Sequence, residues 1–271
     1  NKCHSVEEIE KFANYRPLVA SIKLDGLSCR LIYENGDLVR AESRGNGIEG
    51  NDITQAVKQF QNVPLHINKE GTYVIDGEAL ITLDDFAEIN KDGQFKNSRN
   101  LAAGTLSSLD TSVVKDRRLS WFAWEVVEND SADETNLSFH NQLAEASELG
   151  FDVVPFFDVV SFENVHMDYQ VVIDEMLDIA EQECLPQDGV VFKFDDVQYG
   201  KSLGNTSHHF RNGIAFKVKN DSVETTLKNI EYTIGKTGVL TPTAVFESVE
   251  IEGTTVERAT LHNISIMKEL L

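Results

Sequence analysis

The chain has 271 residues, of which 41% are hydrophobic and 25% are charged, values typical of a globular protein with a sizeable core. Forty-five acidic and 24 basic residues give a formal net charge of −21, which by itself argues against a polyanionic partner. The three cysteines are far apart, so neither a disulfide framework nor a zinc site is predicted, and no apolar run or signal-peptide pattern indicates a membrane or secretory route. We therefore expect a cytoplasmic protein.

The first features along the chain are a short helix and a strand with charged residues in it. A capping box at residues 5–8 opens the helix, and a mostly buried strand begins at Leu18. Lys23 and Asp25 then stand where apolar residues are expected, and Gly26 lets the backbone turn. A lysine at the edge of a core can lose its proton and attack phosphorus or a carbonyl carbon. The structural alternative is a strand-end lysine that reaches water beside a turn aspartate.

A hairpin and a second acidic strand follow. Asn35-Gly36 is the strongest short hairpin signal, and it separates alternating segments at residues 28–33 and 38–44. Residues 44–52 are rich in glycine, which fits either a flexible loop or a close approach of backbone to a phosphate. Residues 73–81 form an apolar strand that is interrupted by acidic residues, and a helix is predicted to begin at Thr82.

The rest of the chain alternates helices and strands until its character changes at Asn220. We expect helices over residues 97–109, 139–149 and 165–183, and strands over residues 119–127, 153–160, 188–194 and 214–219. Beyond Asn220 the pattern is one of short strands with tight turns, over residues 230–234, 239–251 and 255–261. We therefore predict one domain over residues 1–219 and a second over residues 220–271.

Ionisable residues occur inside four of the apolar strands. They are Lys23 with Asp25, Glu78, Asp188 with Lys193, and Lys217. One such residue is often a satisfied structural group, but four sets in one domain predict a shared pocket. Lysines and carboxylates together suit a nucleotide phosphate with a divalent metal, and because no P-loop or dinucleotide-binding glycine motif is present, side chains must contact the phosphate.

Six short motifs follow one another along the chain. They are Lys23-Leu24-Asp25-Gly26, Ser43-Arg44-Gly45-Asn46-Gly47, Asp76-Gly77-Glu78, Asn97-Ser98-Arg99-Asn100-Leu101-Ala102-Ala103-Gly104, Asp188-Gly189-Val190-Val191 and Ala215-Phe216-Lys217. Their order is similar to that seen in NAD-dependent DNA ligases. The fourth motif separates bacterial-type enzymes from ATP-dependent ligases and capping enzymes. The chain therefore resembles the adenylation domain of this family, and residues 235–263 resemble the start of its OB domain. The resemblance implies an α+β nucleotidyltransferase fold, of the ATP-grasp-like ligase type, with antiparallel sheets flanked by helices and followed by a partial OB-type β-barrel.

The resemblance also implies roles for individual residues. Lys23 is similar to the nucleophile that forms a lysyl–AMP bond and releases nicotinamide mononucleotide. The catalytic set implied is Lys23, Asp25, Glu78, Asp188 and Lys217. The set implied to bind the nucleotide cofactor, NAD, is Ser21, Lys23, Leu24, Arg44, Glu78, Trp124, Lys193 and Lys217. Glu78 and Asp188 are implied to hold Mg²⁺, and Arg99 and Asn100 to contact DNA.

The implied reaction ends with AMP passing to the 5′-phosphate of nicked double-stranded DNA, which is then sealed in replication and repair. Three positions depart from the family pattern: Ser21 stands in place of a glutamate that contacts adenine, Ser107 in place of an arginine, and Asn212 in place of a tryptophan. Nicotinamide mononucleotide recognition and the rest of the OB domain are expected from a second chain or from further domains, because the chain is read as a fragment or as a subunit of a split ligase. Two alternatives stay open, an ATP-dependent or RNA-acting nucleotidyltransferase and a catalytically silent ligase subunit.

Overall fold

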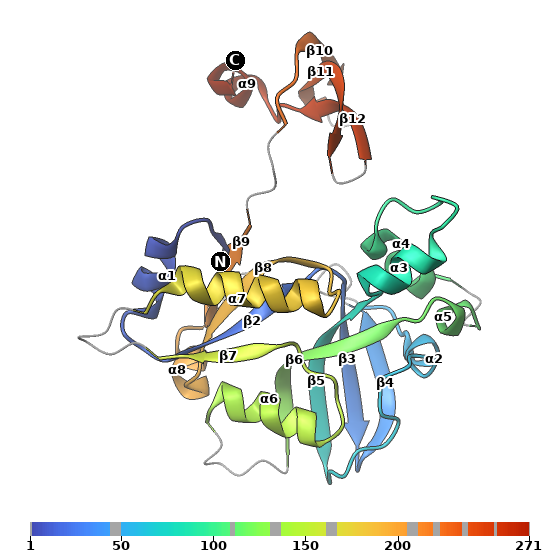
Figure 1. Cartoon of the computed structure of the whole chain (residues 1–271), viewed down its shortest axis with the longest axis vertical. Coiled ribbons are helices and arrows are strands. Elements are labelled where there is room, and N and C mark those ends of the chain that lie inside the picture. The colour runs from blue at the N-terminus through green and yellow to red at the C-terminus, as the bar shows by residue number, and fades with distance from the viewer. Residues whose placement is uncertain are drawn as a thin grey trace. The chain divides into compact units, whose positions relative to one another are not determined.

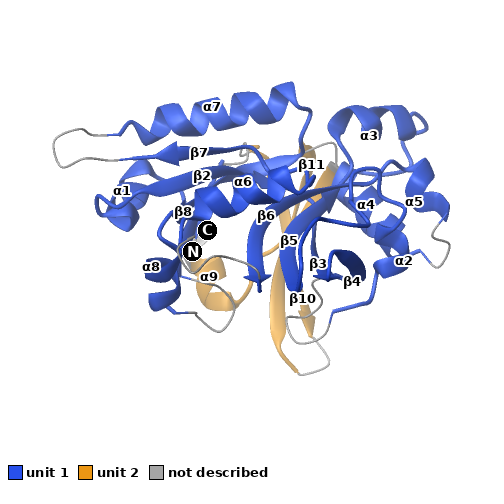
Figure 2. Cartoon of the chain, turned by 90° about the horizontal axis from the view of Figure 1, so that it is seen from below, with its two compact units in different colours: residues 1–218 blue, residues 219–271 orange. Residues whose placement is uncertain are grey.

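The structure is a computed structural model that describes residues 2–43, 50–108, 112–130, 137–160, 167–204, 211–218, 223–234, 238–251 and 254–270. The chain divides into two compact units, residues 1–218 and residues 219–271, which Figure 2 colours separately. Among the described residues, the larger unit contains two sheets with helices packed on them, and the smaller unit contains one sheet and one helix (Figure 1). No helix in the described ranges is both long enough and apolar enough to cross a membrane.

The first sheet of the larger unit has five strands and positions most of the charged residues predicted from the sequence. In spatial order the strands are β1 (Lys2–Cys3), β9 (Gly213–Lys217), β8 (Gln187–Phe194), β2 (Leu18–Leu24) and β7 (Phe156–Val159). Only the β1–β9 pair is parallel, and the other neighbours are antiparallel. Because β2 lies between β7 and β8, both of its edges are paired.

The second sheet has four strands and is antiparallel throughout. Its order is β4 (Asp37–Ser43), β3 (Leu27–Glu34), β5 (Thr72–Leu80) and β6 (Ser120–Asn129). The β3–β4 turn is Asn35-Gly36, with φ of 50° and 90°, the left-handed conformation that a two-residue hairpin turn requires. Asp25 and Gly26 join β2 to β3, so the chain passes from one sheet to the other directly after Leu24, the residue that follows Lys23.

Eight helices surround these sheets in the described part of the larger unit. They are α1 (Val6–Ala13), α2 (Thr54–Val57), α3 (Leu83–Ile89), α4 (Ser98–Leu106), α5 (Ser112–Asp116), α6 (Phe139–Glu148), α7 (Tyr169–Gln182) and α8 (Val197–Ser202). Helix α7 lies along one face of the five-stranded sheet (Figure 1), where Met176 packs with Ala20, Ile22 and Phe192 in a fully apolar core. Because strand side chains alternate between faces, Val19, Ser21 and Lys23 lie on the face opposite α7.

A separate core fills the space beside the four-stranded sheet. Trp121, Tyr33 and Ile75 are fully buried there, and the indole Nε1 of Trp121 donates a hydrogen bond to the Cys29 carbonyl at 3.1 Å. The two cores lie on different sheets, so the charged residues predicted to form a site can gather where the sheets meet without entering either core.

The smaller unit is a three-stranded antiparallel sheet followed by a helix. Strand β11 (Leu240–Ile251) pairs with both β10 (Leu227–Ile234) and β12 (Thr254–Thr260), and α9 (Ile264–Leu270) follows. The tight turns that were predicted around residues 235–238 and 252–253 fall mostly outside the described residues.

The α+β prediction with antiparallel sheets is confirmed, and the principal strands lie within a few residues of the predicted bounds. The long acidic helix differs most, since α7 begins at Tyr169 rather than residue 165, with Asp168 as its N-cap. The Asp168 side chain accepts hydrogen bonds from the backbone N–H groups of Gln170 and Val171, which fixes the start of the helix there. The capping box predicted at residues 5–8 is only partly observed. Ser5 is the N-cap of α1, as predicted, but its side chain makes no capping hydrogen bond.

Candidate functional site

Two of the predicted lysines lie in one row across three neighbouring strands. Lys23 of β2 pairs with Gly189 of β8, and Gly189 pairs in turn with Lys217 of β9. Because directly opposed residues project to the same face of a sheet, both lysines lie on the face opposite α7. The register therefore explains how residues 194 positions apart in the chain come together.

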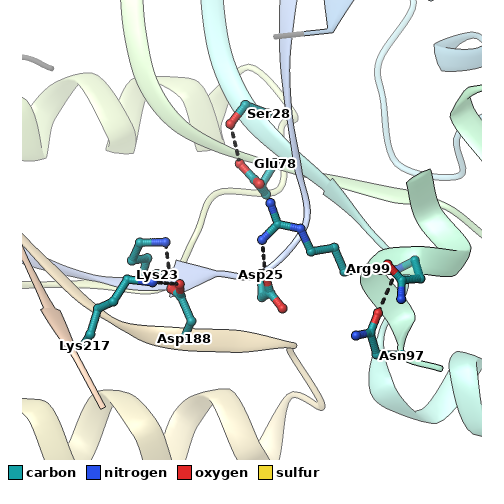
Figure 3. A network of polar contacts seen from close by, with 9 residues as sticks. Lys23, Asp25, Ser28, Glu78, Asn97, Arg99, Asp188 and Lys217 are labelled. Atoms are coloured by element: carbon teal, nitrogen blue, oxygen red, sulfur yellow. Dashed lines mark hydrogen bonds and ion pairs between the residues drawn. The ribbon is translucent and has the colours of Figure 1, made fainter. Parts of the chain in front are cut away.

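Asp188 holds both of these lysines. Its Oδ1 lies 2.7 Å from Lys23 Nζ and its Oδ2 lies 2.6 Å from Lys217 Nζ. Figure 3 shows both lysines directed at this carboxylate. Partial burial acts to raise the pKa of Asp188, but the two ammonium groups outweigh burial and lower this pKa below its ordinary value. Asp188 is therefore ionised at neutral pH. Two ammonium groups that share one carboxylate leave a net positive charge, which suits a phosphate.

The backbone of Gly189 allows this row to form. Its φ is +147°, and a Cβ at this position would lie 2.0 Å from the carbonyl oxygen of Phe216 on the neighbouring strand. Only glycine avoids both the unfavourable backbone conformation and the clash. The glycine next to Asp188 is thus required for β8 and β9 to approach closely at the two lysines.

Glu78 lies on the other sheet and is largely buried. Its Oε2 accepts a hydrogen bond from Ser28 Oγ at 3.0 Å, across the β3–β5 pair. Burial raises the pKa of Glu78 from 4.5 to about 7, although the Ser28 hydrogen bond and the positive charges of Lys23 and Arg99 oppose this rise. The carboxyl group therefore exchanges its proton near neutral pH.

Replacing Glu78 with glutamine is expected to stabilise the protein at pH 8. Folded Glu78 keeps its proton up to about pH 7, whereas the unfolded chain loses it near pH 4.5, so the wild-type protein loses stability as pH rises through this interval. Over the whole interval the loss amounts to roughly 3 kcal/mol at about 1.4 kcal/mol per pKa unit. Urea unfolding at pH 5 and pH 8 should show that the free energy of unfolding of the Glu78→Gln variant, relative to that of wild type, increases as pH rises. The exposed Glu70→Gln is the control, and a pH-independent difference for Glu78→Gln would contradict the prediction.

Arg99 connects the two sheets at the point where β2 passes into β3. Its Nη1 lies 2.5 Å from Asp25 Oδ1, and Figure 3 shows the guanidinium between the carboxyl groups of Asp25 and Glu78. Asn97 positions the arginine, because its side chain caps α4 by accepting a hydrogen bond from the backbone N–H of Asn100 at 2.8 Å. About half of the Arg99 side chain is exposed, so it can exchange Asp25 for another anion.

Lys193 does not join Lys23 and Lys217. It pairs with Val19 and Gly213, four residues along β2 from the Lys23 row, and its Nζ lies 3.0 Å from Glu125 Oε2. The same ammonium group lies 5.0 Å from the centre of the Trp124 ring. The predicted residues thus form two groups on one face, with Ser21 between them.

The remaining predicted residues are placed as follows. Ser21 is 7% exposed and shares the face of Lys23, whereas the Leu24 side chain packs in the core on the α7 side and leaves only its backbone for a ligand. Arg44 and most of its glycine-rich segment lie outside the described residues. No group of three or more His, Cys, Asp or Glu side chains that could hold a metal occurs in the described part of the chain.

Sequence reasoning missed two polar residues of this region, Ser28 and Glu125. Ser28 lies opposite Glu78 in the β3–β5 register, so its position would follow from aligning the predicted hairpin with the strand at residues 73–81. Glu125 follows Trp124 in an aromatic strand, but its place at the site depends on an irregularity in β6 that the residue pattern does not show.

Comparison with known proteins agrees with this geometry. Residues 4–221 match the model of the NAD-dependent DNA ligase adenylation domain, and residues 224–270 match that of the NAD-dependent DNA ligase OB-fold domain. The chain belongs to the NAD-dependent DNA ligase family. The region that matches the adenylation domain contains Lys23, Asp188 and Lys217. The family resemblance found in the motifs is confirmed.

Curated relatives of the ligase family are considerably longer than this chain. A DNA ligase of Lachnoclostridium phytofermentans is 42% identical over 263 residues, which cover 93% of this chain and 38% of that protein. A DNA ligase of Ruminiclostridium cellulolyticum is 38% identical over 275 residues, covering 100% of this chain and 41% of that protein. The chain thus spans about two fifths of the length of these relatives.

Solved structures support the fold. A structure titled "Pmar-Lig_Pre." aligns with 99% of this chain and 59% of its own length, with a TM-score of 0.55 at 15% identity. A second structure, titled "Pmar-Lig_PreS3", gives a TM-score of 0.54 at the same identity. Together with the OB-fold match, this agreement confirms the nucleotidyltransferase-like ligase fold predicted from the motifs.

Proposed function

We propose that this chain is the adenylylating part of an NAD-dependent DNA ligase and that Lys23 is its nucleophile. The observation that carries the proposal is that Lys23 and Lys217, on one face of the sheet, share the partly buried Asp188. An amine, a second cation and a carboxylate within hydrogen-bonding distance are the groups needed to transfer a phosphoryl-type group to nitrogen. Membership of the NAD-dependent DNA ligase family supports NAD as the proposed substrate.

In the proposed first step, Lys23 Nζ releases its proton to solvent, and the neutral amine attacks the phosphorus that bears adenosine. The phosphorus–nitrogen bond forms as the bond to nicotinamide mononucleotide breaks, and that product leaves with the electron pair. Asp188 orients the amine beforehand through the 2.7 Å ion pair, and Lys217 stabilises negative charge on the phosphoryl oxygens. The Lys23–Asp188 pair must separate as attack begins, because the amine reacts only when neutral.

Glu78 and Asp188 are the residues proposed to hold Mg²⁺ with the substrate phosphates. Carboxylate oxygens suit this ion, which is usually bound by one or two carboxylates and completed by phosphate and water. Asp188 is ionised, and Glu78, with a pKa of about 7, becomes ionised at the upper end of the neutral range. When bound, the ion would neutralise charge on the phosphate oxygens.

The two later steps act on nicked DNA. An oxygen of the 5′-phosphate attacks the lysyl-bound phosphorus, the phosphorus–nitrogen bond breaks and Lys23 regains its proton. The 3′-hydroxyl then attacks the activated 5′-phosphate, AMP leaves and the strand is sealed. Arg99 is proposed to contact a DNA phosphate in exchange for Asp25, with Asn100 beside it on α4. Arg44 is proposed to lie near the nucleotide.

The distribution of charge along the chain reduces the conflict between DNA binding and a net charge of −21. Residues 119–192 contain 17 acidic residues and no lysine or arginine, whereas the rest of the chain has 28 acidic and 24 basic residues. The acidic stretch forms β6, α6, β7, α7 and the start of β8. The remainder is nearly neutral and contains Arg99, so DNA can be approached there. Further domains or a second chain are proposed to supply nicotinamide mononucleotide recognition and more positive charge.

The proposal is tested by incubating the chain with Mg²⁺ and either NAD or ATP, with and without a domain that recognises nicotinamide mononucleotide. Mass spectrometry should find AMP on Lys23 from NAD when that domain is present. AMP from ATP would instead indicate an ATP-dependent nucleotidyltransferase, and no label under any condition would indicate a silent subunit.

A further inference from the structure

The strand β6 contains a bulge at Trp124. Gly77 of β5 pairs with Ala123, whereas the next residue back along β5, Asp76, pairs with Glu125, so Trp124 is an extra residue without a partner in the ladder. Before the bulge, Ala123 faces the apolar core of the four-stranded sheet, and after it Val126 faces that core. Both Trp124 and Glu125 consequently project to the opposite side. Bulges of this kind re-aim side chains and are frequent beside active sites.

The bulge brings Glu125 to Lys193. The carboxylate Oε2 lies 3.0 Å from Lys193 Nζ, and the side chains of Glu125 and Lys193 are only 20% and 13% exposed. The ammonium group also lies 4.9 Å from the centre of the Phe139 ring. Among the described residues Lys193 Nζ has no hydrogen-bond partner of good geometry, so the ion pair leaves donor capacity for a ligand.

This pair lies at a defined distance from the nucleophile. Lys193 pairs with Val19, and Val19 is four residues before Lys23 on the same strand and face. At about 3.3 Å per residue the two rows are roughly 13 Å apart, which is the scale of a nucleoside monophosphate laid along the strand. With phosphate at Lys23, the base then lies at Trp124, Glu125 and Lys193, where an aromatic ring is available for stacking.

We propose that Glu125 determines the choice of base in this ligase, by accepting a hydrogen bond from the exocyclic amino group of adenine. Lys193 donates a hydrogen bond to the neighbouring ring nitrogen. The acceptor Glu125 and the donor Lys193 thus match the amino group, which is a donor, and the ring nitrogen, which is an acceptor, on adjacent positions of adenine. Hypoxanthine and guanine place an oxygen where adenine has its amino group, and that oxygen faces the Glu125 carboxylate without a proton between them. Ser21, on the same face, is too short to substitute. This inference rests on the proposed function, because it takes the bound nucleotide to be adenylate.

The test is calorimetric binding of AMP, IMP and GMP to the chain. Wild type should bind AMP at least about tenfold more tightly than IMP or GMP, because a buried carboxylate opposite an oxygen lacks its partner. In the Glu125→Gln variant the carboxamide can donate to the oxygen, so the preference for AMP should disappear or reverse. Glu128→Gln, an exposed glutamate on the same strand with the same change of charge, should keep the wild-type preference.

The outcomes separate this inference from the proposed function. Equal binding of AMP and IMP by wild type, or an unchanged preference in Glu125→Gln, overturns the role of Glu125 while lysyl–AMP formation from NAD can still stand. Failure of AMP to bind together with absence of lysyl–AMP overturns both. The wild-type comparison needs no variant, so it holds even if Glu125→Gln leaves Lys193 unpaired and does not fold.

Discussion

Replacing Lys23 with arginine is expected to abolish formation of the covalent adenylate, with a loss of roughly 10⁴-fold or more, as for removal of a nucleophile in other enzymes. Arginine keeps the positive charge and the ion pair with Asp188, but its guanidinium stays protonated and cannot attack phosphorus. Intact-mass measurement after incubation with NAD, Mg²⁺ and the nicotinamide mononucleotide-binding domain should show only unmodified protein.

The matched control for this variant is Lys11→Arg on helix α1, an exposed lysine outside the site. It should be adenylylated like wild type, and circular dichroism should show that both variants are folded. Adenylate found on Lys23→Arg at a rate near that of wild type would assign the nucleophile to another residue.

Replacing Gly189 with alanine is expected to destabilise the larger unit by about 3 kcal/mol or more, the combined scale of backbone strain and overpacking. The new Cβ would lie 2.0 Å from the Phe216 carbonyl oxygen and 3.1 Å from the Cα of Lys217, so β8 and β9 must separate. Separation moves Lys217 away from Asp188, and adenylylation should fall by roughly 100-fold, since small misplacements carry penalties of that size. Urea unfolding and the adenylylation rate measure the two effects.

Gly104→Ala is the opposite case within the same chain. Gly104 lies in helix α4, and a Cβ there meets no heavy atom within 4 Å. Alanine should therefore stabilise the protein by about 0.5–1 kcal/mol through helix propensity. If Gly189→Ala proved as harmless as Gly104→Ala, the close approach of β8 and β9 would not be a requirement of the fold.

Local signals were sufficient to predict the elements that carry the site. The Asn35-Gly36 turn fixed the β3–β4 hairpin, and the charged residues inside apolar strands marked β2, β5, β8 and β9. These signals depend on neighbours within a few residues, where turn geometry and side-chain alternation dominate. The family motifs then supplied the fold class, which periodicity alone would not have distinguished from other α+β arrangements.

Contacts between elements could not be predicted in the same way. The pairing of Lys23 with Gly189 rather than its neighbour depends on strand register, which shifts by one residue directly beyond Lys23. The bulge at Trp124 likewise has no local signature, so the aromatic was identified while Glu125 beside it was not. Lys193 was predicted to share a pocket with the other lysines, and the register, which the sequence does not show, places it on their face four residues along β2 from Lys23. The site roles themselves remain predictions.

The crossing of the chain from β2 to β3 at Asp25 and Gly26 has a mechanical consequence. The five-stranded sheet supplies Lys23, Asp188 and Lys193 to the site, and the four-stranded sheet supplies Glu78 and Trp124. A nucleotide that contacts all of them would link the two sheets non-covalently. Binding of a nucleotide there would then join the two sheets into one cooperative unit, so local unfolding at their junction should be rarer with the nucleotide bound than without it.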